Sequence, residues 1–121
     1  MITEAEDLAK IDACTNCRYG APVVLLVCYD RDDVWVRPFD NANSGEVDAS
    51  IVTTYMTLEA QDLGLGTCWV MYFDPSKAIE LFALPENIIP VAMLPMGYPL
   101  EESRPSKKHF DRKPLEDLLL P

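Results

Sequence analysis

Two cysteines, Cys14 and Cys17, have the spacing that is typical of half a zinc site or of a dithiol redox pair. The other two, Cys28 and Cys68, lie singly inside predicted strands, and the one histidine, His109, lies far along the chain. No second pair of ligands completes a metal site. We therefore interpret the cysteines as reduced thiols and assign no metal, with a structural zinc and a redox role as the two alternatives.

Acids, bases and nucleophiles form no recognisable catalytic set elsewhere in the sequence. The histidine lies in a basic segment, and the carboxylates are scattered, so neither a Ser-His-Asp arrangement nor a metal cluster is indicated. If the protein is an enzyme, a bound cofactor must carry the reaction while the protein holds and orients that cofactor. We assign no catalytic side chain.

The element best suited to hold a cofactor begins near Asn43 and ends at two glycines, Gly64 and Gly66. Asn43 followed by Glu46 predicts a capping box, and the length predicts a helix of about four turns. Glycine closes helices because it adopts the left-handed conformation without strain. The next residues, 67–72, predict a buried strand because they are β-branched and aromatic. The turn between helix and strand exposes main-chain groups.

Apolar residues of this helix recur three to four positions apart, which predicts the apolar face of an amphipathic helix. These residues are Ile51, Val52, Tyr55, Met56, Leu58 and Leu63. Polar and charged residues fall largely elsewhere, namely Thr53, Thr54, Thr57, Glu59 and Asp62.

Before this helix, the sequence predicts a helix within residues 1–19, with a capping box from Thr3 and Glu6. The apolar run at 23–30 then predicts a strand covered on both faces. Residues 31–42 predict a loop with at most one short helical turn. We expect the loop aromatics Trp35 and Phe39 to pack it onto the body of the protein.

After the central helix, Asp74 and Pro75 predict the capped start of a helix over 77–82. Residues 88–96 predict a strand in which Pro90 and Pro95 each remove a backbone donor. Such prolines are expected at the ends or edge of a strand, which predicts a ladder of about four or five residues. Residues 113–119 predict a last short helix. Strands alternating with helices indicate a layered fold of α and β elements.

Length and composition favour one globular domain over residues 1–121, with 49% hydrophobic residues and a net charge of −10. Residues 104–113 carry five basic side chains and one acidic side chain, whereas the rest of the chain is strongly acidic. This balance argues against nucleic acid and anionic membranes as partners. No apolar run is long enough to span a bilayer, and acidic residues follow Met1, so we predict a cytoplasmic protein.

Five matches in order along the chain resemble the nitroreductase family of flavin enzymes. They are the strand GAPVVLLVCYD, the run GLGTCWV after the long helix, an FD turn, a strand ending in Gly-Tyr-Pro, and RKPLEDLL near the end. The resemblance covers roughly the C-terminal two-thirds of the family's pattern and lacks its N-terminal phosphate-binding helix. It implies an α+β layered fold, with a central sheet flanked by helices and truncated at the N-terminus.

The resemblance also implies FMN as cofactor, NAD(P)H as electron donor, nitroaromatics or quinones as acceptors, and a homodimer. It places Asn43, Ser44, Gly45 and Glu46 against the flavin ring, brings the backbone of Gly64, Leu65 and Gly66 close to the flavin, and puts Arg112 on the FMN phosphate. Without the resemblance, these residues are equally interpreted as a helix start, a helix stop and a surface cation. The alternative functions are a catalytically silent binding or scaffold protein, and a small metal or redox protein using Cys14 and Cys17.

Overall fold

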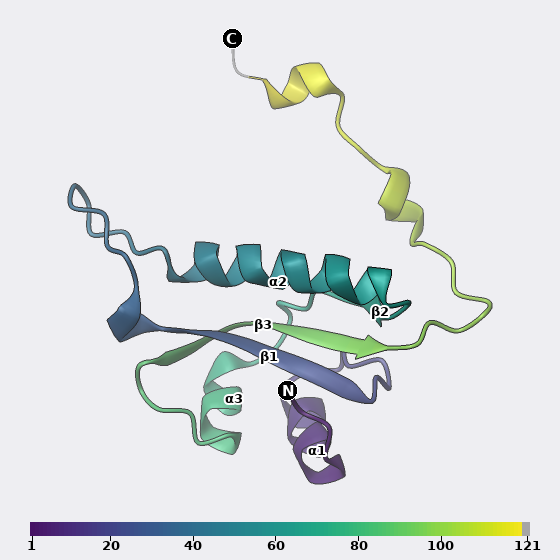
Figure 1. The fold of residues 1–121 in the computed structure, drawn as a ribbon, viewed down its shortest axis with the longest axis horizontal. Coiled ribbons are helices and arrows are strands. Elements are labelled where there is room, and N and C mark those ends of the chain that lie inside the picture. The colour runs from purple at the N-terminus through teal and green to yellow at the C-terminus, as the bar shows by residue number, and fades with distance from the viewer. Residues whose placement is uncertain (120–121) are drawn as a thin grey trace.

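The computed structural model describes residues 1–119, and its helices and strands form three layers (Figure 1). One layer is a three-stranded antiparallel sheet with strand order β1-β3-β2. Helix α2 covers one face of the sheet, and helices α1 and α3 lie together on the other. The elements are α1 (Ala5–Cys14), β1 (Val23–Asp30), the 3₁₀ turn η1 (Arg31–Asp33), α2 (Gly45–Asp62), β2 (Gly66–Thr67), α3 (Pro75–Leu81), β3 (Ile88–Gly97), and the 3₁₀ turns η2 (Lys107–Phe110) and η3 (Leu115–Leu118).

The α+β fold class is therefore confirmed, and β1 lies between two helical layers as expected. Helix α1 is shorter than predicted, because Ile2 pairs with Val24 at the edge of the sheet instead of joining the helix. The capping box of Thr3 and Glu6 is wrong, since the N-cap is Glu4 and no side chain caps the helix. Because the helix begins only at Ala5, Ile2 is free to extend the sheet by one bridge.

The start of α3 is confirmed: Pro75 is its first residue, and the Asp74 side chain accepts a hydrogen bond from the Lys77 N–H at 3.0 Å. The main hydrophobic core lies between the sheet and the α1–α3 layer. Its buried members are Ile11, Cys14, Val24, Val70, Ala78 and Met93, and larger side chains such as Leu8, Phe73 and Phe82 pack around them. This face of the sheet is filled in the ordinary way by apolar side chains.

The prolines of β3 do not shorten it, because β3 is the ten-residue central strand. Pro90 pairs with Cys28 beside a register shift after Val27, and such irregularities tolerate a missing donor. Pro95 is opposite Val24, whose N–H and C=O both bond to Ile2 on the far side. No bond between β1 and β3 therefore needs an N–H from Pro95.

The strand predicted at 67–72 is mostly absent. The ladder with β3 stops after Thr67, and only Val70 resumes it, through two 2.9 Å hydrogen bonds with Met93. The Cys68 N–H does reach the Pro95 carbonyl, at 3.2 Å, but proline has no N–H to return. The segment consequently lies along the sheet edge, with Cys68, Met71 and Tyr72 exposed.

Helix α2 lies between the predicted start and stop, but its 18 residues make about five turns instead of four, and its side chains do not face as predicted. Its buried residues are small: Gly45, Ala49, Thr53 and Ala60. The large apolar residues expected in the core are all exposed, namely Ile51, Val52, Tyr55, Met56, Leu58 and Leu63. Small residues let the helix backbone approach the sheet, while Val52, Met56 and Leu63 line open cavities beside β1 and stay incompletely covered.

Residues 34–44 form a narrow projecting loop rather than a loop packed on the body (Figure 1). Trp35 is 62% exposed and Phe39 is 94% exposed, so the prediction that they fix the loop to the protein is wrong. The loop is instead held by its own hydrogen bonds, including a bridge between Val36 and Asn43. The short helical turn allowed by the sequence is present as η1.

Residues 98–119 form an exposed tail that leaves the end of β3 and stands on the side of the sheet that carries α2 (Figure 1). The helix predicted at 113–119 is a single 3₁₀ turn, η3. Within residues 1–119, no helix combines the length and the apolar character that crossing a bilayer requires.

Candidate cofactor site

The loop Asn43–Glu46 leads directly into the first turn of α2. The Asn43 side-chain oxygen accepts a hydrogen bond from the Gly45 N–H at 3.0 Å, and the Ser44 hydroxyl donates to the Asp48 carboxylate at 2.6 Å. The predicted capping box is wrong, because the N-cap is Ser44 and no side chain caps the helix. Asn43 instead forms a local turn with its own backbone, as asparagine commonly does.

Position 45 requires glycine for a structural reason that the sequence did not reveal. A Cβ atom at this position would lie 2.3 to 2.7 Å from three atoms of the Tyr29 ring, which is closer than real Cβ contacts. The glycine therefore allows Tyr29, at the end of β1, to pack against the helix start. Gly45 is buried, so a ligand at this loop would meet the exposed side chains around it.

Gly64 closes α2 in the left-handed conformation, with φ of +76°, as predicted. The Leu65 N–H bonds to the Ala60 carbonyl at 2.8 Å and the Gly64 N–H bonds to the Gln61 carbonyl at 3.0 Å, which is a Schellman motif. A Cβ at Gly64 would meet no atom within 4 Å, so the main chain here is open on that side. The turn is thus accessible to a flat ligand.

Gly66 opens onto a surface cavity of about 410 Å³ at the end of the sheet. The loop after α1 forms one wall, with Tyr19 in the left-handed region at φ of 55°, and the chain after β3 forms another, with Tyr98. Cys68 also lines this cavity. Two exposed tyrosines and glycine main chain make it a concave, partly aromatic surface.

The two predicted flavin-contacting groups do not meet within one chain. Asn43–Glu46 lies at the start of α2 and Gly64–Gly66 lies at its end. Eighteen helical residues separate the groups by about 27 Å at 1.5 Å per residue. One isoalloxazine ring cannot span that separation, so a single copy of the chain holds at most one of the two groups against a flavin.

Arg112 lies in the exposed tail, between η2 and η3. Its guanidinium donates to the carbonyls of Lys108 and Asp111, at 3.3 and 3.0 Å, both within the tail itself. Among residues 98–119 the hydrogen bonds are local. The basic segment 104–113 is therefore not docked on the body of its own chain.

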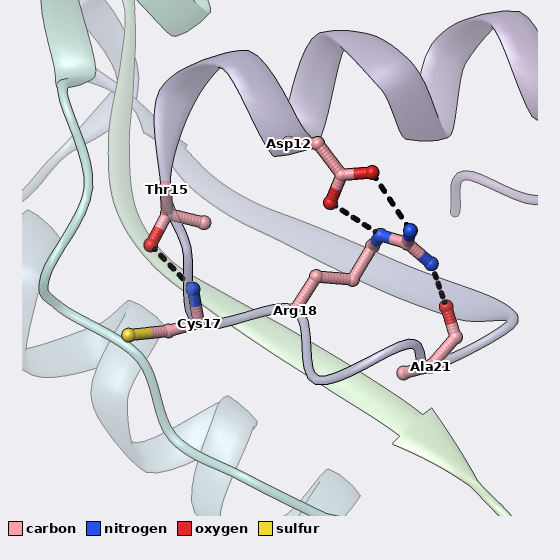
Figure 2. Close-up of polar contacts among 5 residues, drawn as sticks. All are labelled: Asp12, Thr15, Cys17, Arg18 and Ala21. Atoms are coloured by element: carbon pink, nitrogen blue, oxygen red, sulfur yellow. Dashed lines mark hydrogen bonds and ion pairs between the residues drawn. The ribbon is translucent and has the colours of Figure 1, made fainter.

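The loop that follows α1 is held in place by Arg18. Figure 2 shows its guanidinium between two partners: it donates to both Asp12 carboxylate oxygens, at 2.6 and 2.7 Å, and to the Ala21 carbonyl at 2.9 Å. These hydrogen bonds lower the pKa of the Asp12 carboxyl below its ordinary value. Thr15 fastens the loop to the sheet edge by donating to the Tyr72 carbonyl at 2.5 Å.

Cys14 and Cys17 do not form a site in this structure. All four cysteines are free thiols, and burial raises the pKa of Cys14 above its ordinary value. The Cys17 thiol donates to the Asn16 side chain at 3.3 Å, and its sulfur points away from Arg18 (Figure 2). In the described part of the chain, no three potential metal ligands come together.

Comparison with known proteins decides the family. The model of the family described as "Nitroreductase family" matches residues 10–98, which is well over half of the chain. The chain is a member of the nitroreductase family. A crystal structure of a nitroreductase family protein from Clostridium difficile 630 superimposes with a TM-score of 0.87 at 42% identity, covering 98% of this chain and 69% of that one.

Other relatives of this nitroreductase-family chain are longer. A provisionally named NADH dehydrogenase/NAD(P)H nitroreductase of Methanothermobacter thermautotrophicus is 33% identical over 67% of this chain and 42% of its own length. A protein of the same name from Archaeoglobus fulgidus is 30% identical over 69% of this chain and 48% of its own length. The chain thus spans less than half of these two curated relatives. An FMN-dependent nitroreductase from Clostridium difficile R20291 shares the fold, with a TM-score of 0.65 at 24% identity.

The residues present fit FMN in part. Open main chain at Gly64 suits the close approach of a flat ring, and the tail supplies cations for a phosphate. The loop Asn43–Glu46 lies too far from this turn to join it in one chain.

Proposed function

We propose that this protein is an FMN-dependent oxidoreductase of the nitroreductase type, acting as a homodimer in the cytoplasm. It moves electrons from NAD(P)H to nitroaromatic, quinone or similar acceptors. One observation carries the proposal: the two predicted flavin-contacting groups lie at opposite ends of α2, and the outward face of that helix is apolar and exposed. The site is then built between two copies.

The outward face of α2 supports such an assembly. We define the outer stripe of α2 as Val47, Ile51, Tyr55 and Leu58, which recur at helical spacing and are each at least half exposed. Contiguous exposed apolar surface of this kind marks protein–protein interfaces. If a second copy packs its α2 antiparallel along the stripe, the Asn43–Glu46 loop of each copy comes beside the Gly64–Gly66 turn of the other.

When bound, FMN would accept a hydride from NAD(P)H and pass electrons to an acceptor. The chain's own residues would orient it. Main chain at Gly64 and Gly66 would contact the ring, the polar side chains of Asn43 and Ser44 would supply hydrogen-bonding groups near it, and Arg112 would pair with the phosphate. The apolar stripe, covered by the partner, would exclude water from the site.

The test measures the molecular mass, the flavin content and the activity of the full chain as wild type and as two variants. Wild-type protein is expected to be a yellow dimer that oxidises NADH or NADPH with a quinone. Ile51→Glu places a charge in the outer stripe and should give a colourless monomer. Gln61→Glu adds the same charge at an exposed position of α2 outside the stripe and should behave as wild type.

Light scattering after gel filtration gives the mass, and flavin released on heating gives the FMN content. A colourless wild-type protein that does not quench added FMN fluorescence would refute the enzyme and favour a silent scaffold. A yellow monomer would refute the shared site while leaving flavin binding intact.

A further inference from the structure

The projecting loop before α2 is held by hydrogen bonds among its own residues. The Arg37 guanidinium donates two hydrogen bonds to the Asp40 carboxylate, each of 2.7 Å. The Arg37 N–H bonds to the Ala42 carbonyl at 2.8 Å, and the Asn41 N–H bonds to the Arg37 carbonyl at 3.0 Å. These hydrogen bonds join residues of the loop to one another and define its narrow turn.

Two exposed aromatic residues of this loop, Trp35 and Phe39, lie at different distances along it from the predicted flavin loop. The Trp35 carbonyl accepts a hydrogen bond from the Ser44 N–H at 3.0 Å, which places the Trp35 backbone directly beside Asn43–Glu46. Phe39 lies at the turn of the loop, where Arg37 pairs with Asp40. The Trp35 backbone is thus adjacent to the candidate site, whereas Phe39 lies at the turn of the loop.

The exposure of Trp35 has no structural reason within the chain. Its indole is the largest side-chain ring a protein has and gains most from burial, yet 62% of the residue is exposed. A loop held by its own hydrogen bonds lowers the ordering cost of presenting the ring, which is how aromatic anchors are arranged in binding sites. An exposed, pre-positioned indole therefore indicates a contact that a ligand completes.

We propose that Trp35 is the residue against which a planar aromatic electron acceptor stacks. This inference rests on the proposed function, because the acceptor must lie near a flavin held beside Asn43–Glu46. The indole face carries partial negative charge, so it attracts electron-poor rings such as nitroaromatics and quinones in an offset stack. Acceptors without an aromatic face gain nothing from Trp35.

The test compares three variants of the FMN-loaded protein: Trp35→Ala, Trp35→Phe and, as the matched control on the same loop, Phe39→Ala. Each is assayed with a nitroaromatic and with ferricyanide, which has no ring to stack. Trp35→Ala should lower kcat/KM for the nitroaromatic about two- to tenfold, mainly through KM, and leave ferricyanide unchanged. Trp35→Phe should retain most of the wild-type value, and Phe39→Ala should leave both substrates unchanged.

A second readout does not need turnover. In a Trp69→Phe background, Trp35 is the sole tryptophan, and its fluorescence should be quenched saturably by a nitroaromatic added without NAD(P)H. Flavin content and ferricyanide reduction report the proposed function separately. If wild type lacks both, the proposed function fails and Trp35 loses its role with it.

If wild type binds FMN and reduces ferricyanide but Trp35→Ala keeps the wild-type preference for nitroaromatics, only the Trp35 inference is overturned. It is equally overturned if Trp35→Ala changes both substrates alike, or if it converts the protein to a monomer, since Trp35 would then serve folding or subunit contact.

Discussion

The two faces of the sheet are packed in opposite ways. The face toward α1 and α3 is filled by large apolar side chains, with Ile11 and Met93 fully buried. The face toward α2 meets mainly small residues, Ala49, Thr53 and Ala60, and leaves open apolar cavities of about 430 and 420 Å³ between α2 and β1. The face toward α1 and α3 is a fully packed core, whereas the face toward α2 is only partly covered.

This difference separates two uses of apolar residues. Around α1 and α3 they stabilise the chain, because removing them from water is worth roughly 25 cal/mol per Å². Along α2 the chain gains little from them as it stands, so their contribution requires a partner. Four predictions test the contrast, beginning with the largest expected effect.

Ile11→Ala and Ile51→Ala make the same chemical change on the two sides. Ile11 is fully buried, so its truncation should lower the free energy of unfolding by about 2–5 kcal/mol. Ile51 is 51% exposed, so its truncation should change the free energy of unfolding of the monomer by less than about 0.5 kcal/mol. Denaturant unfolding measures both, and similar losses in a monomeric protein would contradict the contrast.

The same pair sharpens the dimer proposal. If the outer stripe of α2 is buried between copies, Ile51→Ala should weaken association, and the unfolding midpoint should depend on protein concentration. Ile11→Ala should lower the midpoint by the same amount at every concentration.

Gly45→Ala tests the one tight contact on the α2 side. The new methyl would overlap the Tyr29 ring, which must move, so we expect a loss of about 1–3 kcal/mol in the free energy of unfolding. Combining it with Tyr29→Ala should cost less than the sum of the two single changes, because the overlap disappears. Strict additivity would show that Tyr29 does not press on the helix start.

Gly64→Ala and Gly66→Ala test whether the glycine after α2 is required for its backbone conformation or for lack of space for a side chain. Gly64 has a positive φ, so alanine should cost about 1 kcal/mol although nothing fills the space. Gly66 has ordinary backbone and room for a methyl, with its nearest neighbour at 3.6 Å, so alanine should cost less than about 0.5 kcal/mol. Thermal unfolding compares them, and equal losses would refute the left-handed closure.

Asp12→Asn should have a small effect that appears as a change in the pH dependence of stability. The folded-state pKa of Asp12 is lowered, chiefly by its hydrogen bonds to Arg18, so this carboxylate stabilises the fold above its ordinary pKa. That stability is lost as the pH falls through the folded-state pKa, because the unfolded chain binds the proton more readily. Both side chains are partly exposed, so the effect should stay under about 1 kcal/mol.

The measurement is the free energy of unfolding of wild type and Asp12→Asn from pH 7 to pH 3. Wild type should lose more stability than the variant over this range. Parallel curves would show that solvent screening removes the contribution of the pair.

Local signals predicted local structure well. Asp74 and Pro75 start α3 where expected, Gly64 closes α2 by taking a positive φ, and the apolar run at 23–30 is a strand between two layers. Each of these features depends on interactions within a few residues. The resemblance to the nitroreductase family was carried by such short motifs in order, and the family comparison confirms it.

Features that depend on distant residues were not predictable in the same way. The sequence indicated that α2 has an apolar stripe, but the choice of the face toward the sheet depends on how closely small residues such as Ala49 and Ala60 let two backbones approach. Pro95 suggested an edge strand, yet it lies in the central one, because Val24 bonds to Ile2 instead. The packing of Tyr29 on Gly45 has no local signal at all.

The sequence by itself determined strand β1, the capped start of α3, the glycine closure of α2 and the family, because hydrogen bonding and backbone conformation within a few residues set these features. Only the tertiary structure decided that the large apolar residues of α2 stay exposed, that the Asn43–Glu46 and Gly64–Gly66 groups lie a helix length apart, and that Trp35 is exposed beside one of them. Those outcomes depend on how whole elements pack, and packing is set by contacts between residues far apart in the chain.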